Sequence, residues 1–338
     1  MQTQNHQLKI INWGILGLGH IAKKFANDLK LVPNSELVAV ASRTESNAKA
    51  FAEQFGAKKY YSNYETMLAA GGIDAVYIAT TNETHTELTL LCFKYKIAVL
   101  CEKPLALNTK QVRKMINAAR KHKIFFMEAM WSYFVPAFKM ALHHATVLKT
   151  VGEPLYVKAD FGAYFPFDAK ARHYNIEMGG GALLDIGIYV IALAQAVFGM
   201  PKKIKAQAQM NAATGVDEVC SMMFEHEKGY SQLSAAFTAK MPTQAWIFCT
   251  EGYIYLPEGF YHPNSYTIVR YDGRNKPIEE TIEMPVEGFG YQFEIIEVCD
   301  CLRSGELESS IMTHKNSVDF MKTMDTVRKK INLKFPQE

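Results

Sequence analysis

Short apolar runs alternate with longer helical patterns along the first 130 residues of the chain. The runs are rich in β-branched and small apolar residues, which is typical of buried strands, and the segments between them are long enough for helices. Strands are expected at 7–16, 37–41, 59–61, 74–80 and 98–101, and helices at 21–31, 48–55, 87–95 and 110–122. This alternation predicts βαβ units, and therefore a doubly wound parallel sheet covered by helices on both faces.

The pattern changes after residue 130. A helix is expected at 137–148, and the chain from 154 to about 271 is then mostly strand-like, with short polar or Gly/Pro-containing links. The clearest strands are 203–210, 218–225, 230–239 and 245–249, followed by helices at 291–303 and 315–330. This order predicts an α+β second domain with a large, open and mostly antiparallel sheet. We therefore divide the chain into domains at 1–130 and 131–338.

One apolar run invites a membrane interpretation. Residues 186–200 carry no charge, but the run is only 15 residues long and follows Asp185, whereas a membrane span needs about 20 apolar residues. A buried core helix is the better interpretation. The first nine residues are polar and lack the apolar region of a secretory signal, so we expect no membrane partner and a cytoplasmic location.

Composition narrows the class of partner. The 37 Lys and Arg residues exceed the 34 Asp and Glu residues by only three, so nothing points to nucleic acid. The six cysteines form no C-x-x-C pair and no cluster with histidine, which favours reduced structural thiols and no metal site. The expected partner is a small molecule.

A glycine-rich turn separates the first expected strand from the first expected helix. Residues 17–22 (GLGHIA) have the form G-x-G-x-x-A. Gly17 permits a tight turn, and Gly19 lets a pyrophosphate approach the backbone. The helix start at His20 and Ile21 offers N–H groups and the positive end of the helix dipole. In this strand–turn–helix context the motif predicts a dinucleotide site of the Rossmann type, with a purely structural turn as the alternative.

The end of the second strand indicates which cofactor is preferred. NAD sites place a carboxylate here, about 20 residues after the glycines, to accept from the ribose 2′-OH. The chain instead has Ser42 and Arg43, with no acid before Glu45. Ser42 can donate to a 2′-phosphate, and Arg43 can pair with it or stack on adenine. NADP is therefore the expected cofactor, with NAD as the second option and a solvated surface side chain as the alternative for Arg43.

Two further strand ends carry polar residues. The fourth strand is followed by Thr80, Asn82 and His85, and the fifth by Glu102 and Lys103. Ligands of doubly wound sheets sit at the carboxyl ends of the strands, so we expect these side chains around the cofactor. Lys103 is placed to approach the nicotinamide, where an ammonium could bind a substrate oxygen, relay its proton or lower the pKa of a phenol. A surface lysine before a turn proline is the alternative.

These motifs, taken together and in this order, resemble the Gfo/Idh/MocA oxidoreductase family. The resemblance rests on the glycine turn, Asn82-x-x-His85, Glu102-Lys103-Pro104 and residues 127–131 (MEAMW), and it continues into Arg172 and residues 179–189 (GGGALLDIGIY). It spans nearly the whole chain and is nearest the branch of dihydrodiol and NADP-dependent D-xylose dehydrogenases. It implies a Rossmann domain followed by a substrate domain, and hydride transfer between nicotinamide and a hydroxyl or carbonyl group.

The last of these segments also has a physical interpretation of its own. Three glycines before Ala-Leu-Leu let a loop meet a helix with close backbone approach. Asp185 and Tyr189 are four residues apart and share one face of that helix, where an acid and a phenol are costly to bury without partners. The residues alone leave two interpretations open, a functional pair or a hydrogen-bonded core Tyr with an Asp near the helix start.

The resemblance implies a role for each side chain. Tyr189 would give or take the proton at the reacting oxygen, and Lys103 would lower the pKa of Tyr189 or orient that oxygen. Asp185 would bond a neighbouring hydroxyl or tune the pair, and Arg172 would contact the substrate. Trp131 would form a wall for a sugar face or a diol ring, with a core or hinge Trp as the alternative.

The chain departs from the family's usual pattern at a few positions. Where members often carry Arg two residues after the Trp, this chain has Tyr133, and we expect the loss of a cation there to change substrate preference. Thr81 and Lys96 replace a proline and a glycine, and we expect them to affect loop shape only. Substrate choice is expected to depend on the loops 161–175 and 256–263.

We therefore expect an NADP(H)-dependent oxidoreductase that acts on a sugar or a cyclic trans-diol. One alternative is reduction of a keto-sugar of the anhydrofructose type by the same groups. A less favoured one is a non-catalytic regulator that senses NADP. The alternating strands of the second domain leave an apolar sheet face to be covered, and members of the family pair through it, so a homodimer through the C-terminal sheet is expected.

Overall fold

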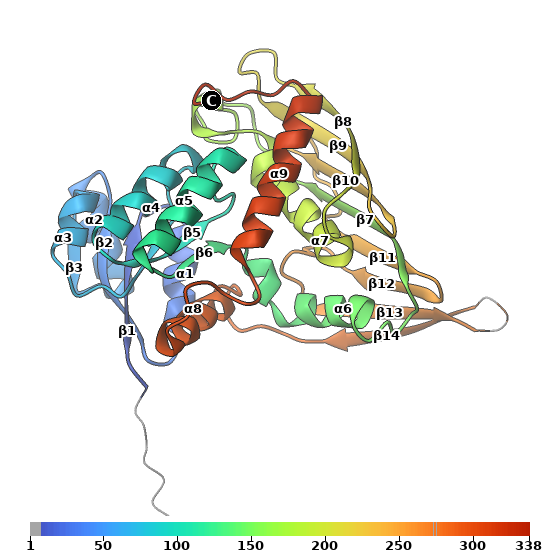
Figure 1. The fold of residues 1–338 in the computed structure, drawn as a ribbon, viewed down its shortest axis with the longest axis horizontal. Coiled ribbons are helices and arrows are strands. Elements are labelled where there is room, and N and C mark those ends of the chain that lie inside the picture. The colour runs from blue at the N-terminus through green and yellow to red at the C-terminus, as the bar shows by residue number, and fades with distance from the viewer. Residues whose placement is uncertain (1–7, 273, 275) are drawn as a thin grey trace, which may run out of the picture.

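The computed structural model describes residues 8–272, 274 and 276–338 and contains two sheets, one in each half of the chain (Figure 1). The first is parallel, with its six strands in the order β3-β2-β1-β4-β5-β6. Its strands are β1 Ile11–Leu16, β2 Ser35–Ala41, β3 Lys59–Tyr61, β4 Ala75–Ile78, β5 Ala98–Glu102 and β6 Phe126–Ala129. Its helices are α1 His20–Leu29, α2 Glu45–Phe55, α3 Tyr64–Ala69, α4 His85–Lys94 and α5 Thr109–His122. This is the strand order of doubly wound dinucleotide-binding domains, which confirms the fold expected for this half.

The sequence pattern does not predict strand β6. It has only four residues, and Glu128 interrupts its apolar run, yet all four are buried. It adds to the edge of the sheet beside β5, with Phe126 opposite Val99. Strand β1 begins at Ile11, later than expected; residue 7 and most of the polar N-terminal segment lie outside the described residues.

The second sheet has eight strands in the order β14-β13-β12-β11-β7-β10-β9-β8, and among the strands described only β7 and β10 are parallel neighbours. The strands are β7 Pro154–Gly162, β8 Lys203–Met210, β9 Asp217–Glu225, β10 Tyr230–Ala236, β11 Ala245–Cys249, β12 Gly252–Leu256, β13 Ser265–Tyr271 and β14 Pro277–Glu283. The large, mostly antiparallel sheet is therefore confirmed. Strand β14 escapes the sequence pattern because it has no buried position that would create an alternation.

Helices cover one face of this sheet and leave the other open (Figure 1). They are α6 Pro136–Thr146, α7 Ile188–Phe198 and α9 His314–Lys330, while α8 Gln292–Ser304 packs on α1. Of the described helices, one stretch, Ile176–Phe198, is long and apolar enough to cross a membrane, but 83% of its apolar window is buried inside the protein. Its α7 part is the core helix that the sequence predicts.

The last two helices return to the first domain. The Asp28 carboxylate of α1 accepts from the amides of Phe289 and Tyr291 at the start of α8, at 3.0 and 2.8 Å. Asp325 of α9 accepts from the Thr109 amide at the start of α5, at 2.9 Å. Each carboxylate lies at the positive end of a helix dipole, which is favourable. We propose residue 130 as the domain boundary, with α8 and α9 joining the two domains.

Candidate active site

The glycine turn after β1 lies tightly against the end of β4. Gly17 has a φ of +84°, and a Cβ there would lie 2.6 Å from the Thr80 methyl group and 2.8 Å from the Ala79 oxygen, so only glycine fits. The space beside Gly19 is open, because a Cβ there would meet no atom of the described residues within 4 Å. No side chain caps α1 where it begins at His20. An open helix start of this kind fits a pyrophosphate, so the turn can hold a dinucleotide.

The end of β2 offers groups for a 2′-phosphate. Ser42 is buried, and its hydroxyl accepts from the Asn47 side-chain amide at 3.1 Å. Arg43 is exposed near Tyr64; burial raises the pKa of Tyr64, and the charge of Arg43 opposes that rise. Glu45, the first acid after the strand, is exposed at the start of α2. A hydroxyl and an amide therefore meet here, next in the chain to the exposed Arg43, and no motif in the sequence marks Asn47.

The loops after β4 and β5 are tied to each other. His85 is fully buried, with Nδ1 3.0 Å from the Pro104 oxygen and Nε2 3.3 Å from the Thr80 oxygen. Burial lowers the pKa of His85 to about 4, so the ring is neutral at pH 7. Both ring nitrogens thus lie against backbone oxygens of the two loops, and the expected contact of His85 with the cofactor stays a prediction. Asn82 instead reaches the second domain, where its side chain donates to the Gly179 oxygen at 3.2 Å.

Glu102 ends β5 and supports the segment that carries Lys103. It is buried and accepts from the Tyr77 hydroxyl and, at 3.2 Å, from the Lys103 amide. Burial raises the pKa of Glu102, and the charge of Lys103 opposes that rise. These two bonds fix the backbone from which the Lys103 side chain departs.

Lys103 meets Asp185 and Tyr189 from the second domain. Asp185 lies in the short π-helical turn Leu183–Gly187, which continues into α7 and brings Tyr189 near the start of that helix. The Lys103 ammonium donates to the Asp185 backbone oxygen at 2.6 Å and to its Oδ1 at 3.2 Å. It also lies 4.8 Å from the centre of the Tyr189 ring. The structure thus brings together the three residues that the sequence singles out as catalytic.

Arg172 and His173 complete the surroundings of Asp185. The two terminal nitrogens of Arg172 donate to the two Asp185 carboxylate oxygens at 3.2 and 3.3 Å, and His173 Nε2 lies 3.8 Å from Oδ2. Burial opposes the ionisation of Asp185, but the charges of Lys103 and Arg172 outweigh it and hold its pKa well below the usual range. The carboxylate is therefore charged at neutral pH and fixes both cations. His173 directly follows Arg172, but no motif in the sequence marks it.

Tyr189 is a neutral phenol at pH 7. Its hydroxyl accepts from the Trp131 indole N–H at 2.8 Å. Burial raises the pKa of Tyr189 well above its usual value, the charge of Glu102 adds to the rise, and the bond from Trp131 opposes it. The Lys103 ammonium lies over the ring face and is held by Asp185, and a lowering of the Tyr189 pKa by Lys103 stays a prediction.

The two halves of the chain match two family models. Residues 11–130 match the oxidoreductase family with an NAD-binding Rossmann fold, and residues 141–255 match the GFO/IDH/MocA C-terminal domain. The chain belongs to the Gfo/Idh/MocA oxidoreductase family. The resemblance carried by the sequence motifs is thereby confirmed.

Individual relatives extend this finding. The trans-1,2-dihydrobenzene-1,2-diol dehydrogenase of Xenopus laevis is 34% identical over 332 residues, covering 96% of this chain and 99% of the relative. That of Homo sapiens is 31% identical over 338 residues, covering 97% and 99%. A solved 3-ketoreductase from Actinomadura kijaniata, in complex with NADP and TDP-benzene, shares the fold with a TM-score of 0.84 at 24% identity, over 95% of this chain and 98% of that one. The chain is accordingly an NAD(P)-dependent oxidoreductase acting on hydroxyl groups.

In this Gfo/Idh/MocA oxidoreductase, Trp131 is at the centre of an aromatic cluster. Its indole stacks on Tyr291, with 4.5 Å between ring centres and 9° between planes, and on His262, with 5.4 Å and 17°. Tyr261 lies beside the Tyr189 ring at 4.9 Å. These partners come from the loop before β13 and from the start of α8. The loop 256–263 is expected from the sequence to influence substrate choice, but no pattern in it distinguishes Tyr261 and His262.

Tyr133 lies away from this cluster. Its hydroxyl donates to the Ala192 oxygen of α7 at 2.9 Å, and its ring packs against Phe138 and Phe320. The position where other family members often carry a cation is therefore a core position in this oxidoreductase. The expected effect of Tyr133 on substrate preference finds no support in its contacts.

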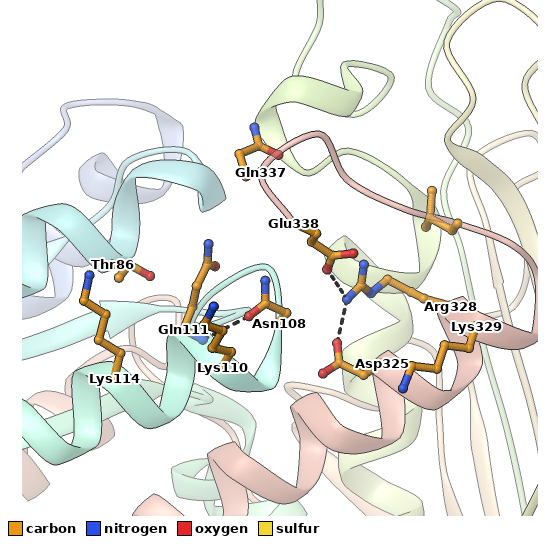
Figure 2. A pocket seen from close by; sticks show the side chains of 11 residues that line it. Thr86, Asn108, Lys110, Gln111, Lys114, Asp325, Arg328, Lys329, Gln337 and Glu338 are labelled. Carbon is orange, nitrogen blue, oxygen red and sulfur yellow. Dashed lines mark hydrogen bonds and ion pairs between the residues drawn. The ribbon is translucent and has the colours of Figure 1, made fainter.

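A separate cavity of about 490 Å³ lies between the first domain and the end of α9 (Figure 2). It is lined by Thr86, Asn108, Lys110, Gln111, Lys114, Asp325, Arg328, Lys329, Leu333, Gln337 and Glu338. Arg328 donates to both Asp325 and Glu338 at 2.6 Å. This lining includes none of the cofactor or substrate residues expected from the sequence, so the cavity is distinct from the site around Tyr189.

Proposed function

We propose that this oxidoreductase uses NADP(H) to move a hydride between the nicotinamide and a carbon that bears a hydroxyl or carbonyl group, in a sugar or a cyclic trans-diol. The observation that carries the proposal is the contact of Lys103 with Asp185 and Tyr189, made between the two domains. A cation, an acid and a phenol in one buried group suit the transfer of a proton at an alcohol oxygen.

The protein's own part is to hold and move one proton. Asp185 takes two of the three N–H donors of Lys103, which leaves the third for a substrate oxygen. The Tyr189 hydroxyl, held by Trp131, has its proton available for the same oxygen. Bound nicotinamide supplies or accepts the hydride. In reduction the Tyr189 phenol would give its proton to the oxygen that becomes a hydroxyl and would be left as a phenolate, and in oxidation that phenolate would take the proton back.

A second candidate function is the reduction of a keto-sugar. The raised pKa of Tyr189, caused first by its burial, keeps the phenol protonated, which is the form that a reductase needs at the start of its reaction. Oxidation would begin more readily from a phenolate. The same residues serve both directions, so this candidate differs from the first in direction and in substrate.

Three groups, two that follow β2 and one on α2, support NADP over NAD. Ser42, Arg43 and Asn47 can all donate to a 2′-phosphate, and the carboxylate that an NAD site would place at this strand end is replaced by Ser42. A guanidinium beside a hydroxyl and an amide suits a dianionic phosphate better than a ribose hydroxyl.

The substrate proposal rests on aromatic and charged groups around Tyr189. Phe161 lies 5.6 Å from the Tyr189 ring and stacks on Tyr261 at 4.6 Å, and Trp131 stands beside them. Such rings suit the apolar face of a sugar or a cyclic diol, and the half-exposed Arg172 offers donors for its hydroxyls. The diol alternative gains support from the relatives that are named dihydrobenzenediol dehydrogenases.

We also propose a cytoplasmic homodimer that forms through the open face of the second sheet. Met223, Tyr230 and Tyr271 are exposed on three different strands of that sheet. Apolar side chains spread over one sheet face favour association with a second copy. The location is supported by the six cysteines, which are all buried and unpaired, as is usual in a reducing compartment.

A turnover screen tests the function. The protein is mixed with NADP or NAD and with aldoses, inositols or trans-dihydrodiols, and with NADPH and keto-sugars, while absorbance at the nicotinamide band is followed. We expect turnover in at least one class, faster with the phosphorylated cofactor. Tight NADPH binding with no turnover in any class would exclude the proposal and favour a regulator that senses NADP.

A further inference from the structure

Asp217 caps the helix that carries the proposed catalytic residues, although it belongs to a different element. It opens strand β9 and is fully buried. Its Oδ2 accepts from the Leu183 amide at 2.7 Å. Leu183 begins the turn that holds Asp185 and leads to Tyr189, and Ala182 before it offers no capping side chain. A carboxylate at this place satisfies a helix N–H group and suits the positive end of the helix dipole.

The three-glycine loop is built around this carboxylate. Gly181 has a φ of +117°, and a Cβ there would lie 2.2 Å from Asp217 Oδ1. The Gly181 amide donates to the His173 oxygen at 2.9 Å, and the Gly181 oxygen accepts from the Asp185 amide at 3.3 Å. One anchored loop therefore fixes both the turn that carries Asp185 and the segment that carries Arg172.

No direct ion pair neutralises Asp217 among the described residues. Its Oδ1 is buried and has no hydrogen-bond partner there. Burial raises the pKa of Asp217 to about 7, and the helix amide, its own amide and the charge of Arg328 oppose that rise. Arg328 approaches from α9 but already donates to Asp325 and Glu338 (Figure 2). Cys220 on the same strand is a neutral thiol, because burial raises its pKa. The carboxylate therefore changes its charge near neutral pH.

We propose that Asp217 is a positioning residue for the reaction: in its ionised form it holds the first turn of the helix so that Asp185 keeps Lys103 in place. The link is direct, because the closest acceptor of the Lys103 ammonium is the Asp185 backbone oxygen, at 2.6 Å. A shift of the turn moves that oxygen and the ammonium with it. This inference rests on the proposed function, since it assigns a task within the same site.

The test is Asp217→Asn in the full chain. The amide oxygen still accepts from Leu183 but carries no charge at any pH. We expect kcat at pH 8 to fall about tenfold, as for the loss of a charge-assisted bond, while KM for NADPH changes less than about twofold. The inflection of kcat near pH 7 should disappear. An unchanged kcat with an unchanged pH profile would overturn the proposal.

The matched control is Asp160→Asn. Asp160 also accepts from one backbone amide, that of Thr243, at 2.7 Å, but it lies on β7 and not at the catalytic helix. This variant should keep the pH profile of the wild type. If it loses the inflection as well, the effect is not specific to the helix start, and the proposal fails.

Hydrogen–deuterium exchange of residues 181–189 gives a readout that needs no turnover. We expect faster exchange in Asp217→Asn than in Asp160→Asn, and equal exchange would overturn the positioning role even in an active enzyme. If the wild type has no turnover, the proposed function fails while the exchange result still decides the role of Asp217.

If Asp217→Asn does not fold, exchange of the wild type is compared at pH 6 and pH 8, after correction for the pH dependence of the intrinsic exchange rates. Protection of residues 181–189 that is equal at both pH values overturns the proposal.

Discussion

The two domains supply the candidate active site in different ways. The first presents its groups from loops that follow parallel strands, with the glycine turn after β1 and Lys103 after β5. The second presents Asp185 and Tyr189 from a helix that lies on a mostly antiparallel sheet. A short motif at a strand end determines the first arrangement, whereas distant contacts such as Asp217 with Leu183 determine the second. Changes near the glycine turn should therefore affect cofactor binding, and changes at the helix should affect the chemical step.

The largest expected effect is that of Tyr189→Phe. The ring and its stacking remain, but the proton at the reacting oxygen is lost, so kcat should fall about 1,000-fold, within the range of general acid–base catalysis. The affinity for NADPH, measured by fluorescence titration, should stay at the wild-type value. Tyr95→Phe is a matched control, because the Tyr95 hydroxyl bonds to the exposed Glu65 and to no other side chain among the described residues. A wild-type kcat in Tyr189→Phe would show that Tyr189 does not transfer the proton.

Lys103→Met tests the point where the two domains meet. The substitution keeps the length of the side chain but removes the donor to the substrate oxygen and the partner of Asp185. We expect kcat to fall about 100-fold and KM for the substrate to rise, because Lys103 serves both binding and proton transfer. Lys94→Met, at an exposed site, should match the wild type in both constants. If only the affinity for NADPH changes, Lys103 belongs to the cofactor site alone.

The sequence predicts the first domain better than the second for a physical reason. Its central strands, β1, β4 and β5, are short apolar runs that are buried on both faces, and its functional groups follow such strands directly. The exception is β6, whose buried Glu128 looks like a surface residue. In the second domain the inner positions alternate with exposed ones, and the outermost strand, Pro277–Glu283, has no buried position at all.

The site itself divides in the same manner. Lys103, Asp185 and Tyr189 can be chosen from motifs, but the bond from Trp131 to Tyr189 and the stacking of His262 depend on segments far apart in the chain. Such contacts leave no local pattern. The role of Asp217 cannot be predicted for the same reason. In the sequence, an acid at the start of a strand is typical of a turn, and only the structure shows its bond to the Leu183 amide. Tyr133 shows the opposite case. It lies two residues after Trp131 in the sequence and is therefore expected to affect the substrate, but its side chain is part of the core.

Glu128→Gln sharpens the comparison, because Glu128 supports Lys103 much as Asp217 supports Asp185. It accepts from the Leu105 amide at 2.9 Å, two residues after Lys103. Burial raises the pKa of Glu128 from its usual 4.5 to about 7. The folded protein thus binds this proton more tightly than the unfolded chain does, so the contribution to stability is full below pH 4.5 and is lost as the pH rises through 7.

The glutamine variant should therefore lose part of the pH dependence of stability. Between pH 5.5 and pH 8, the decrease in the free energy of unfolding should be smaller than in the wild type by about 2 kcal/mol. Urea unfolding at the two pH values measures this difference. Identical decreases in the two proteins would show that Glu128 does not titrate in this range.

Arg43→Ala is expected to affect the cofactor alone. The exposed guanidinium should contribute about 1.4 kcal/mol to binding of the 2′-phosphate, so the Kd for NADPH should rise about tenfold. The Kd for NADH should not change, because NADH lacks that phosphate. Titrations with both cofactors give the ratio, and a rise that is equal for the two would assign Arg43 to the adenine ring rather than to the phosphate.

The smallest expected effect is that of Tyr133→Phe. This variant tests whether Tyr133 contributes to the stability of the core alone or also to the active site. The phenyl ring keeps its packing on Phe138 and Phe320, but the bond from the hydroxyl to the Ala192 oxygen is lost, which should lower the free energy of unfolding by about 1 kcal/mol. Substrate preference and kcat should stay at wild-type values, because no contact of Tyr133 reaches the reacting groups. Ala192 nevertheless lies three residues after Tyr189 on the same helix. A changed substrate preference would therefore show that this bond sets the position of α7, and the second domain would then shape the site from its core as well as from its loops.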